Sequence, residues 1–312
     1  MNILVIGGSG FIGSEVVRYI QSLDWTDARS YTVDVMDLKR PQKNGYALIW
    51  FQKDIRERTL CDADFSPYDV VMVFAAVTSQ LEFEKHPEES FATNVNGLFN
   101  VLEACRKSHV RKVMFASSAA IYGDGNGKAM SEEDRPDPRN MYATSKVVGE
   151  ALVNAYTHKG YFDSLILRYF NVYGLGENPK GDYKSIISTF IEQIRRKGEV
   201  VIYGDGEQRR DFINVKDAAR ITFELAMHQS GTFNVGGGSS VSWNELLDWF
   251  ETEGLHFRDR YIKNPIPDYQ LFTEADVKKL ESVGLRVEAG IKEGIEELIG
   301  TKEGRAFNPF NS

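Results

Sequence analysis

Short apolar segments alternate with amphipathic segments along the first half of the chain. The apolar segments, which predict strands buried on both faces, are residues 3–7, 31–36, 70–76, 112–117 and 164–170. The amphipathic segments, which predict helices, are residues 12–21, 91–107 and 141–157. Because strands and helices alternate, we expect an α/β fold with a doubly wound parallel sheet, right-handed crossovers and helices on both faces.

The pattern changes after about residue 174, where glycine and charged residues become more frequent. The elements expected there are loops at 177–184 and 204–211, helices at 185–197 and 215–228, a strand at 231–235, and short helices and loops from 243 onward. We therefore predict a first domain at residues 1–174 and a smaller, interleaved C-terminal α/β lobe at residues 175–312. Part of residues 205–235 should return to the first domain.

Composition narrows the class of protein. The chain has 312 residues and a net charge of -8, so it has no general electrostatic reason to bind nucleic acid or an anionic membrane. We expect no leader segment, and no apolar run approaches the roughly 20 residues of a membrane helix, which indicates a cytoplasmic protein. Cys61 and Cys105 lack the spacing of a disulfide scaffold or a zinc site, and no metal is expected.

A glycine-rich turn follows the first predicted strand and opens the first predicted helix. Gly7, Gly10 and Gly13 have the spacing GxxGxxG. The first glycine permits a tight turn, the second lets the backbone approach phosphates, and the third lets the helix pack on the strand. Free N–H groups at the helix N-terminus then face the pyrophosphate of NAD or NADP. The first domain is therefore predicted to be a Rossmann-type dinucleotide-binding domain.

The ribose end of this cofactor leaves two alternatives. Asp37 ends the second strand, where an acid accepts hydrogen bonds from the adenosine ribose, and this favours NAD. Asp34 lies earlier and is the weaker candidate. Lys39 and Arg40 follow closely and allow a 2′-phosphate, and hence NADP. Farther along, residues 54 and 55, Asp54 and Ile55, are placed to meet the adenine.

Tyr142 and Lys146 give the sharpest chemical signal. Residues i and i+4 share one face of a helix, so the ammonium should favour the phenolate and lower the tyrosine pKa from near 10. Such a phenolate can take a proton from a sugar hydroxyl while hydride leaves for nicotinamide, and the lysine can also hold the nicotinamide ribose. Ser117 and Ser118 end a neighbouring strand, where ligands bind in such sheets, and either hydroxyl can contact the substrate oxygen.

At these residues the sequence resembles the extended short-chain dehydrogenase/reductase family, in its nucleotide-sugar branch. The resemblance covers nearly the whole chain and rests on five motifs in one order: the glycine turn, Ser-Ser-Ala-Ala-Ile-Tyr-Gly at 117–123, Tyr-x-x-x-Lys at 142–146, Arg-Tyr-Phe-Asn-Val-Tyr-Gly at 168–174, and Gly-Asp-Gly at 204–206 leading to Arg-Asp-Phe at 210–212.

The resemblance implies roles for particular residues. Ser118 would be the catalytic serine, Tyr142 the base and Lys146 its partner. The residues expected at the cofactor are Gly7, Gly10, Phe11, Ile12, Gly13, Asp37, Lys39, Asp54, Ile55, Phe74, Ala75, Ala76, Asn94, Ser117, Tyr142, Lys146 and Tyr169. Those expected at a nucleotide diphosphate sugar substrate are Thr78, Ser79, Ser118, Asn171, Lys180 and Arg210. A guanidinium fork such as that of Arg210 suits a phosphate pair.

Neighbouring residues bear on the reaction. Related 4,6-dehydratases carry Asp-Glu where this chain has Ala119 and Ala120, whereas UDP-glucose 4-epimerases and ADP-glycero-manno-heptose 6-epimerases carry small residues there. The segments at 178–181, with Lys180, and 268–276 are more similar to the heptose epimerases. Thr78 and Ser79 stand where 4-epimerases have a lysine, and Val73 stands where the family often has histidine.

These features predict a nucleotide-sugar epimerase of carbohydrate biosynthesis that works through tightly bound NAD(P) and a keto-sugar intermediate. A nucleotide-sugar dehydrogenase or ketosugar reductase with net cofactor turnover is the main alternative. A non-catalytic NAD(P)-binding protein of this fold is a further alternative, which the Tyr/Lys pair disfavours. The resemblance also implies a homodimer that packs through the helices at 91–107 and 141–157.

Overall fold

A computed structural model describes residues 1–23, 31–41, 49–177, 184–264 and 270–300. The chain divides into two compact units. Unit 1 comprises 1–123, 135–169 and 219–234, and unit 2 comprises 124–134, 170–218 and 235–312. The assignment of residues 1–174 to the cofactor and of residues 175–312 to the substrate stays a prediction.

Unit 1 is built on a seven-stranded sheet with the order β10-β6-β5-β4-β1-β2-β3. Its strands are β1 Asn2–Ile6, β2 Thr32–Asp37, β3 Trp50–Gln52, β4 Val70–Val73, β5 Lys112–Ser118, β6 Asp163–Tyr169 and β10 Gly231–Val235. The five strand pairs β3–β2, β2–β1, β1–β4, β4–β5 and β5–β6 are all parallel. This order is that of a dinucleotide-binding fold, and the predicted doubly wound sheet of Rossmann type is confirmed.

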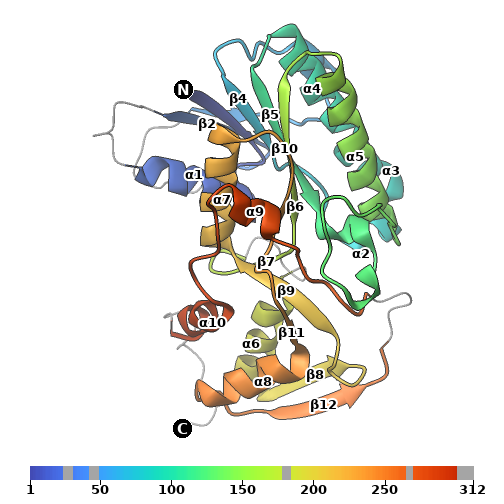
Figure 1. Ribbon diagram of the computed structural model, residues 1–312, viewed down its shortest axis with the longest axis vertical. Coiled ribbons are helices and arrows are strands. Elements are labelled where there is room, and N and C mark those ends of the chain that lie inside the picture. Colours follow the sequence, from blue (N-terminus) through green and yellow to red (C-terminus); the bar gives the residue numbers. More distant parts are fainter. Residues whose placement is uncertain (24–30, 42–48, 178–183, 265–269, 301–312) are drawn as a thin grey trace. The chain divides into compact units, whose positions relative to one another are not determined.

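Helices cover both faces of this sheet, and Figure 1 shows α4 and α5 together on one side of it. The helices of unit 1 are α1 Phe11–Ser22, α2 Gln80–Lys85, α3 Pro87–Phe91, α4 Leu98–Lys107, α5 Met141–His158 and part of α7 Val215–His228, with short helical turns η1 Arg58–Asp62, η2 Ala92–Gly97 and η3 Ala119–Tyr122. Leu102 of α4 and Val153 of α5 share one core with Leu4 and Ile6 of β1. β4 is apolar throughout because both of its faces are buried.

Unit 2 contains two smaller sheets, β11-β9-β7 and β12-β8. Its elements are η4 Gly125–Gly127, β7 Asn171–Tyr173, α6 Ile186–Lys197, β8 Glu199–Tyr203, β9 Arg209–Asn214, the start of α7, β11 Ser240–Ser242, α8 Trp243–Thr252, β12 Arg258–Ile262, α9 Lys278–Ser282 and α10 Ile291–Gly300. Phe190 of α6, Trp243 and Phe250 of α8 and Ile295 of α10 are buried in its core. Nowhere in the described ranges is a helix long and apolar enough to cross a membrane.

Three predicted boundaries were wrong. A loop was expected at 204–211, but β9 begins at Arg209. The polar residues of this strand can be buried because they form hydrogen bonds within the protein. The strand expected at 70–76 ends at Val73, since the N–H groups of Phe74 and Ala75 both donate to the Ile6 carbonyl and turn the chain. The helix expected at 91–107 begins at Pro87 and includes a wider π-helical turn at Ala92–Gly97.

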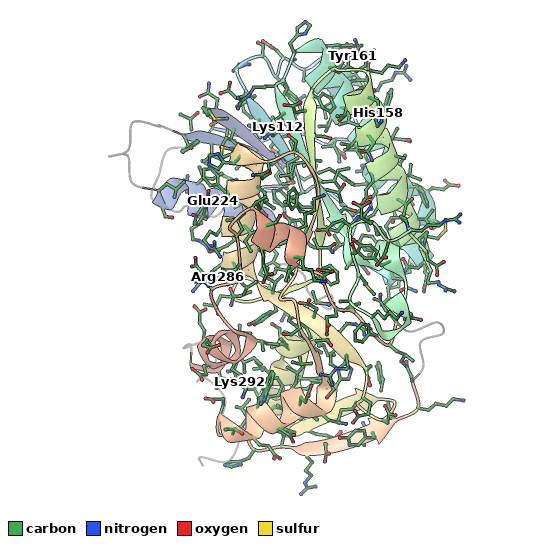
Figure 2. The ribbon with its side chains drawn as sticks, viewed as in Figure 1. Lys112, His158, Tyr161, Glu224, Arg286 and Lys292 are labelled. Atoms are coloured by element: carbon green, nitrogen blue, oxygen red, sulfur yellow. The ribbon has the colours of Figure 1, made fainter. Side chains whose placement is uncertain are left out.

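A buried lysine joins the start of β5 to the end of α7. Lys112, labelled in Figure 2, is only 8% exposed, and its Nζ donates to the carbonyls of Ala226 and Gln229 at 2.9 Å each. Burial lowers the pKa of this lysine. Its ammonium satisfies carbonyls that the last turn of a helix leaves without partners, and its charge complements the helix dipole.

We predict that Lys112→Met destabilises the protein by about 1–3 kcal/mol, because two buried carbonyl groups lose their donor. Urea unfolding measures the free energy of unfolding. Lys128→Met, at an exposed lysine, is the matched control and should leave stability nearly unchanged. Equal stability of the two variants would show that the ammonium contributes nothing to the anchoring of α7.

Candidate active site

The glycine turn between β1 and α1 brings backbone close to backbone. Gly7 has a φ of +86°, which favours glycine, and a Cβ there would lie 2.5 Å from the amide nitrogen of Ala75. A Cβ on Gly13 would clash with the carbonyl oxygen of Gly7. At Gly10, by contrast, a Cβ would meet only that oxygen, at 3.2 Å. Gly7 and Gly13 therefore shape the turn itself, whereas Gly10 leaves space beside it.

This turn fits a dinucleotide pyrophosphate. α1 begins at Phe11 with Gly10 as its N-cap, and no side chain caps its first amides. Free N–H groups at such a helix start are donors for phosphate oxygens. Phe11 is buried and Ile12 half-buried in the same turn.

Asp37 lies directly beside the glycine turn. Its carboxylate accepts the backbone N–H of Ser9 and of Lys39, at 3.0 Å each. Each carboxylate oxygen has a further lone pair for a ribose hydroxyl. Asp34 instead accepts the N–H of Ile49 at 3.0 Å and the hydroxyl of Tyr68 at 2.9 Å, so its oxygens hold neighbouring segments together.

The basic residues after Asp37 differ in their surroundings. Both are exposed, but the guanidinium of Arg40 lies over the ring of Trp50, 5.8 Å from its centroid. The carboxylate of Asp37, held beside the glycine turn, suits NAD.

The segment predicted to meet the adenine is well anchored. Asp54 forms an ion pair with Arg56 at 2.6 Å, and the Arg56 side chain holds the pKa of this carboxyl below its usual range. Ile55 is buried, and a Cβ on Gly97 would lie 2.7 Å from its side chain. Beside this segment, Phe74, Ala75 and Ala76 are half-buried after β4.

The structure brings Ser118, Tyr142 and Lys146 together in unit 1. Asn140 caps α5 by accepting the N–H of Ala143 at 2.8 Å, and this fixes the turn that carries Tyr142. Ser118 ends β5, and its hydroxyl acts on the phenol of Tyr142 to favour the ionised form, which lowers the tyrosine pKa. The Nζ of Lys146 lies 5.9 Å from the Tyr142 ring centroid and donates to the Ala116 carbonyl at 2.7 Å.

The expected direction of the Tyr142 pKa was wrong. Burial raises the pKa of Tyr142 above its usual value of 10, and the hydrogen bond from Ser118 only partly opposes this effect. Burial likewise lowers the pKa of Lys146 to about 8, against the attraction of Glu150. Loss of water is the larger effect at both groups, so it favours the neutral phenol and the neutral amine.

Other residues predicted at the cofactor are committed to contacts within unit 1. Asn94 accepts the N–H of Val77 at 2.7 Å and donates to its carbonyl at 2.9 Å and to Ser145 at 3.0 Å. The Tyr169 hydroxyl is hydrogen-bonded to Thr222 at 2.6 Å. These side chains hold the walls of the site, and their contact with a cofactor stays a prediction.

Two of the predicted serines, Ser117 and Ser79, also form hydrogen bonds within the protein. Ser117 donates to Glu150 at 2.6 Å, which leaves Ser118 as the serine beside Tyr142. Ser79 caps α2 by accepting the N–H of Glu82 at 3.2 Å, whereas Thr78 is exposed. The role of Glu150 was missed, although it follows Lys146 by one helical turn.

In unit 2, two predicted substrate residues lie on neighbouring strands. Asn171 donates to the carbonyl of Asp211 at 2.7 Å and to Thr273 at 3.2 Å. Arg210 is buried, donates to the carbonyls of Arg209 and Gln270, and has its guanidinium 5.6 Å from the Trp243 ring centroid. Lys180 lies outside the described residues.

Asp211 organises this part of unit 2. Its fully buried carboxylate accepts the N–H groups of Gly237 at 2.5 Å, Gly238 at 3.0 Å and Ala275 at 2.8 Å. Burial raises the pKa of Asp211 to about 7, although these three donors favour its ionised form. The carboxylate thereby joins β9 to two other segments beside Arg210.

Comparison with known proteins agrees with this geometry. Residues 3–236 match the NAD dependent epimerase/dehydratase family. A Methanocaldococcus jannaschii protein assigned as a UDP-glucose 4-epimerase is 34% identical, over 95% of this chain and 97% of its own. An ADP-L-glycero-D-manno-heptose-6-epimerase from Alkalilimnicola ehrlichii is 31% identical, over 90% of this chain and 91% of its own.

Among solved structures, MoeE5 in complex with UDP-glucose and NAD is 31% identical to this chain and has a TM-score of 0.84. The similarity covers 96% of this chain and 98% of MoeE5. The fold and the paired tyrosine and lysine define an extended short-chain dehydrogenase/reductase. The chain belongs to the NAD dependent epimerase/dehydratase family.

We predict that Gly10→Ala weakens NAD binding at least about tenfold while it lowers stability by less than about 1 kcal/mol. The added methyl would lie 3.2 Å from the Gly7 carbonyl oxygen, which is a smaller conflict than the one at Gly13, and we expect it on the side from which a pyrophosphate would approach. Isothermal titration calorimetry with NAD and thermal unfolding measure the two effects.

Gly13→Ala is the comparison variant, since its methyl clashes with the turn itself. It should lower stability and NAD affinity together. If Gly10→Ala binds NAD as tightly as the unaltered protein, the turn does not hold the pyrophosphate.

Proposed function

We propose that this protein is an NAD-dependent nucleotide-sugar epimerase. The observation that carries the proposal is the cluster of Ser118, Tyr142 and Lys146 at the strand ends beside the glycine turn. Support comes from relatives named as epimerases, which align over nearly the whole chain, and from MoeE5, which is solved with both UDP-glucose and NAD.

Tyr142 is the proton acceptor in this proposal. Its hydroxyl is held by Ser118, whose own oxygen can contact the sugar hydroxyl that loses the proton. Lys146 supplies positive charge at the ring face, which stabilises a phenolate relative to a phenol. NAD supplies the hydride acceptor when bound. Because Tyr142 accepts a proton in one half-reaction and returns it in the other, the protein itself is unchanged over a cycle.

The residues after Ser118 favour epimerisation over dehydration. Ala119 is buried and Ala120 half-buried in the short turn η3. Neither can donate or accept the additional proton that elimination of water from a sugar requires. Tyr142 and its partner Lys146 remain, and they match a reaction that removes and returns one hydride and one proton.

Unit 2 would hold the diphosphate of the substrate. Arg210 and Asn171 are the proposed contacts, together with Lys180. The buried guanidinium of Arg210 is stacked near Trp243 and held by carbonyls, so its fork is already ordered before a ligand binds. Order of this kind reduces the entropy lost on binding.

We also propose that the protein is a homodimer. α4 carries Phe99, which is 43% exposed, and α5 exposes the small residues Ala151 and Ala155. An exposed aromatic side chain and exposed small residues are typical of helix faces that pack against other helices.

The reaction is tested with UDP-glucose and an ADP-heptose in separate incubations, without added NAD. We expect a new stereoisomer by NMR, with no lasting rise in NADH absorbance, because hydride returns to the sugar. NADH that accumulates with an oxidised sugar would instead identify a dehydrogenase.

We predict that Tyr142→Phe lowers kcat by about 100-fold or more, because the proton acceptor is lost, while NAD affinity changes less than about threefold. The rate is followed by NMR and the affinity by calorimetry. Tyr161→Phe, at a tyrosine that follows α5 and is 45% exposed, is the matched control. Turnover by Tyr142→Phe at the control rate contradicts the proposed mechanism.

A further inference from the structure

A buried ion pair lies beneath the catalytic cluster, between α5 and β6. Arg168 donates to Glu150 from Nη2 at 2.8 Å and from Nε at 3.0 Å. Their side chains are only 7% and 8% exposed. Two parallel bonds between a guanidinium and a carboxylate fix the orientation of both groups.

Further contacts extend this pair to both sides. Glu150 also accepts the hydroxyl of Ser117 at 2.6 Å. Arg168 donates to the Tyr122 hydroxyl at 2.8 Å, and that hydroxyl donates to Asn234 at 2.7 Å. The network thus joins α5 to three strands of unit 1. Ser117, one of its members, directly precedes Ser118.

Lys146 lies one helical turn before Glu150. It is 4% exposed, donates to the Ala116 carbonyl, and has its Nζ 5.0 Å from the Phe115 ring centroid. A buried ammonium with such neighbours is costly unless an opposite charge lies nearby, and Glu150 is the carboxylate whose attraction acts on it.

The titratable and charged groups around Lys146, within the ranges that the structure describes, come from three elements. α5 contributes Tyr142 and Glu150, and β6 contributes Arg168. The turn after β5 contributes Tyr122, which contacts Arg168. Lysine, carboxylate and guanidinium therefore alternate in sign, and removal of Glu150 would leave two buried cations.

We propose that Glu150 is a positioning residue that keeps Lys146 charged and in place beside Tyr142, and that Arg168 fixes Glu150 and offsets part of its attraction for the lysine. The consequence for turnover rests on the proposed function, whereas the effect on the lysine does not. A buried ion pair is weak evidence for a role in stability alone. The contact of this pair with the strand that carries Ala116 and Ser118 links it to the chemistry.

The experiment compares Glu150→Gln, Arg168→Gln and the double variant E150Q/R168Q. Protein labelled with 13C at lysine Cε is titrated by NMR, and the Lys146 signal is assigned with Lys146→Arg. The midpoint should be near 8 in the unaltered protein. Loss of Glu150 should lower it by about one pH unit, loss of Arg168 should raise it similarly, and the double variant should return close to the original value.

Turnover gives the second measurement. Lys146 loses its positive charge as pH rises through its midpoint, so the alkaline limb of kcat should move to lower pH in Glu150→Gln and to higher pH in Arg168→Gln. Glu150→Asp keeps the negative charge, so its alkaline limb of kcat should stay at the original pH. This variant provides a test if Glu150→Gln does not fold.

Glu103→Gln is the matched control, because Glu103 pairs with Arg106 at 3.0 Å on α4 and away from Lys146. In this variant the Lys146 titration midpoint and the alkaline limb of kcat should not move. Unchanged Lys146 midpoints in all Glu150 and Arg168 variants, with only a lower melting temperature, would overturn the proposal. An unaltered protein that epimerises no nucleotide sugar would overturn the proposed function instead, and the NMR titration would still decide the role of Glu150.

Discussion

The backbone contact between the ends of β1 and β4 determines the geometry of the site. Gly7 approaches Ala75 so closely that a single Cβ would not fit, and the Ile6 carbonyl accepts two amides from the chain that leaves β4. These contacts end both strands at the same edge of the sheet. β5 is hydrogen-bonded to β4 in register, so Ser118 reaches that edge as well.

Loss of water governs the electrostatics at this edge. Lys146 is buried and Tyr142 is half-buried, and loss of water shifts both groups toward their neutral forms. A proton acceptor in such a place depends on fixed charges and hydrogen bonds for its ionised form. The hydroxyl of Ser118 and the carboxylate of Glu150 act in this way, on the phenol and on the ammonium respectively.

The sequence allowed accurate prediction where a local spacing has one structural meaning. The three glycines between a strand and a helix, and the tyrosine and lysine one turn apart, belong to this class. The strand β9 escaped prediction because Arg210 and Asp211 are polar, and only the folded chain supplies the carbonyls and amides that allow their burial. The direction in which the Tyr142 pKa shifts could not be predicted for a related reason, because the extent of its burial depends on the tertiary structure.

Buried carboxylates serve the two units by different means. Glu150 in unit 1 is held by a cation and a hydroxyl, so its effect on a neighbour depends on a balance of charge. Asp211 in unit 2 is held by three backbone amides from separate segments, so it contributes position without a compensating side chain. Asn171 bonds to the backbone carbonyl of Asp211 and Arg210 precedes it on β9, so both proposed diphosphate contacts lie beside the residue that this carboxylate anchors. Their arrangement is therefore set inside unit 2, by contacts that exist before any ligand binds.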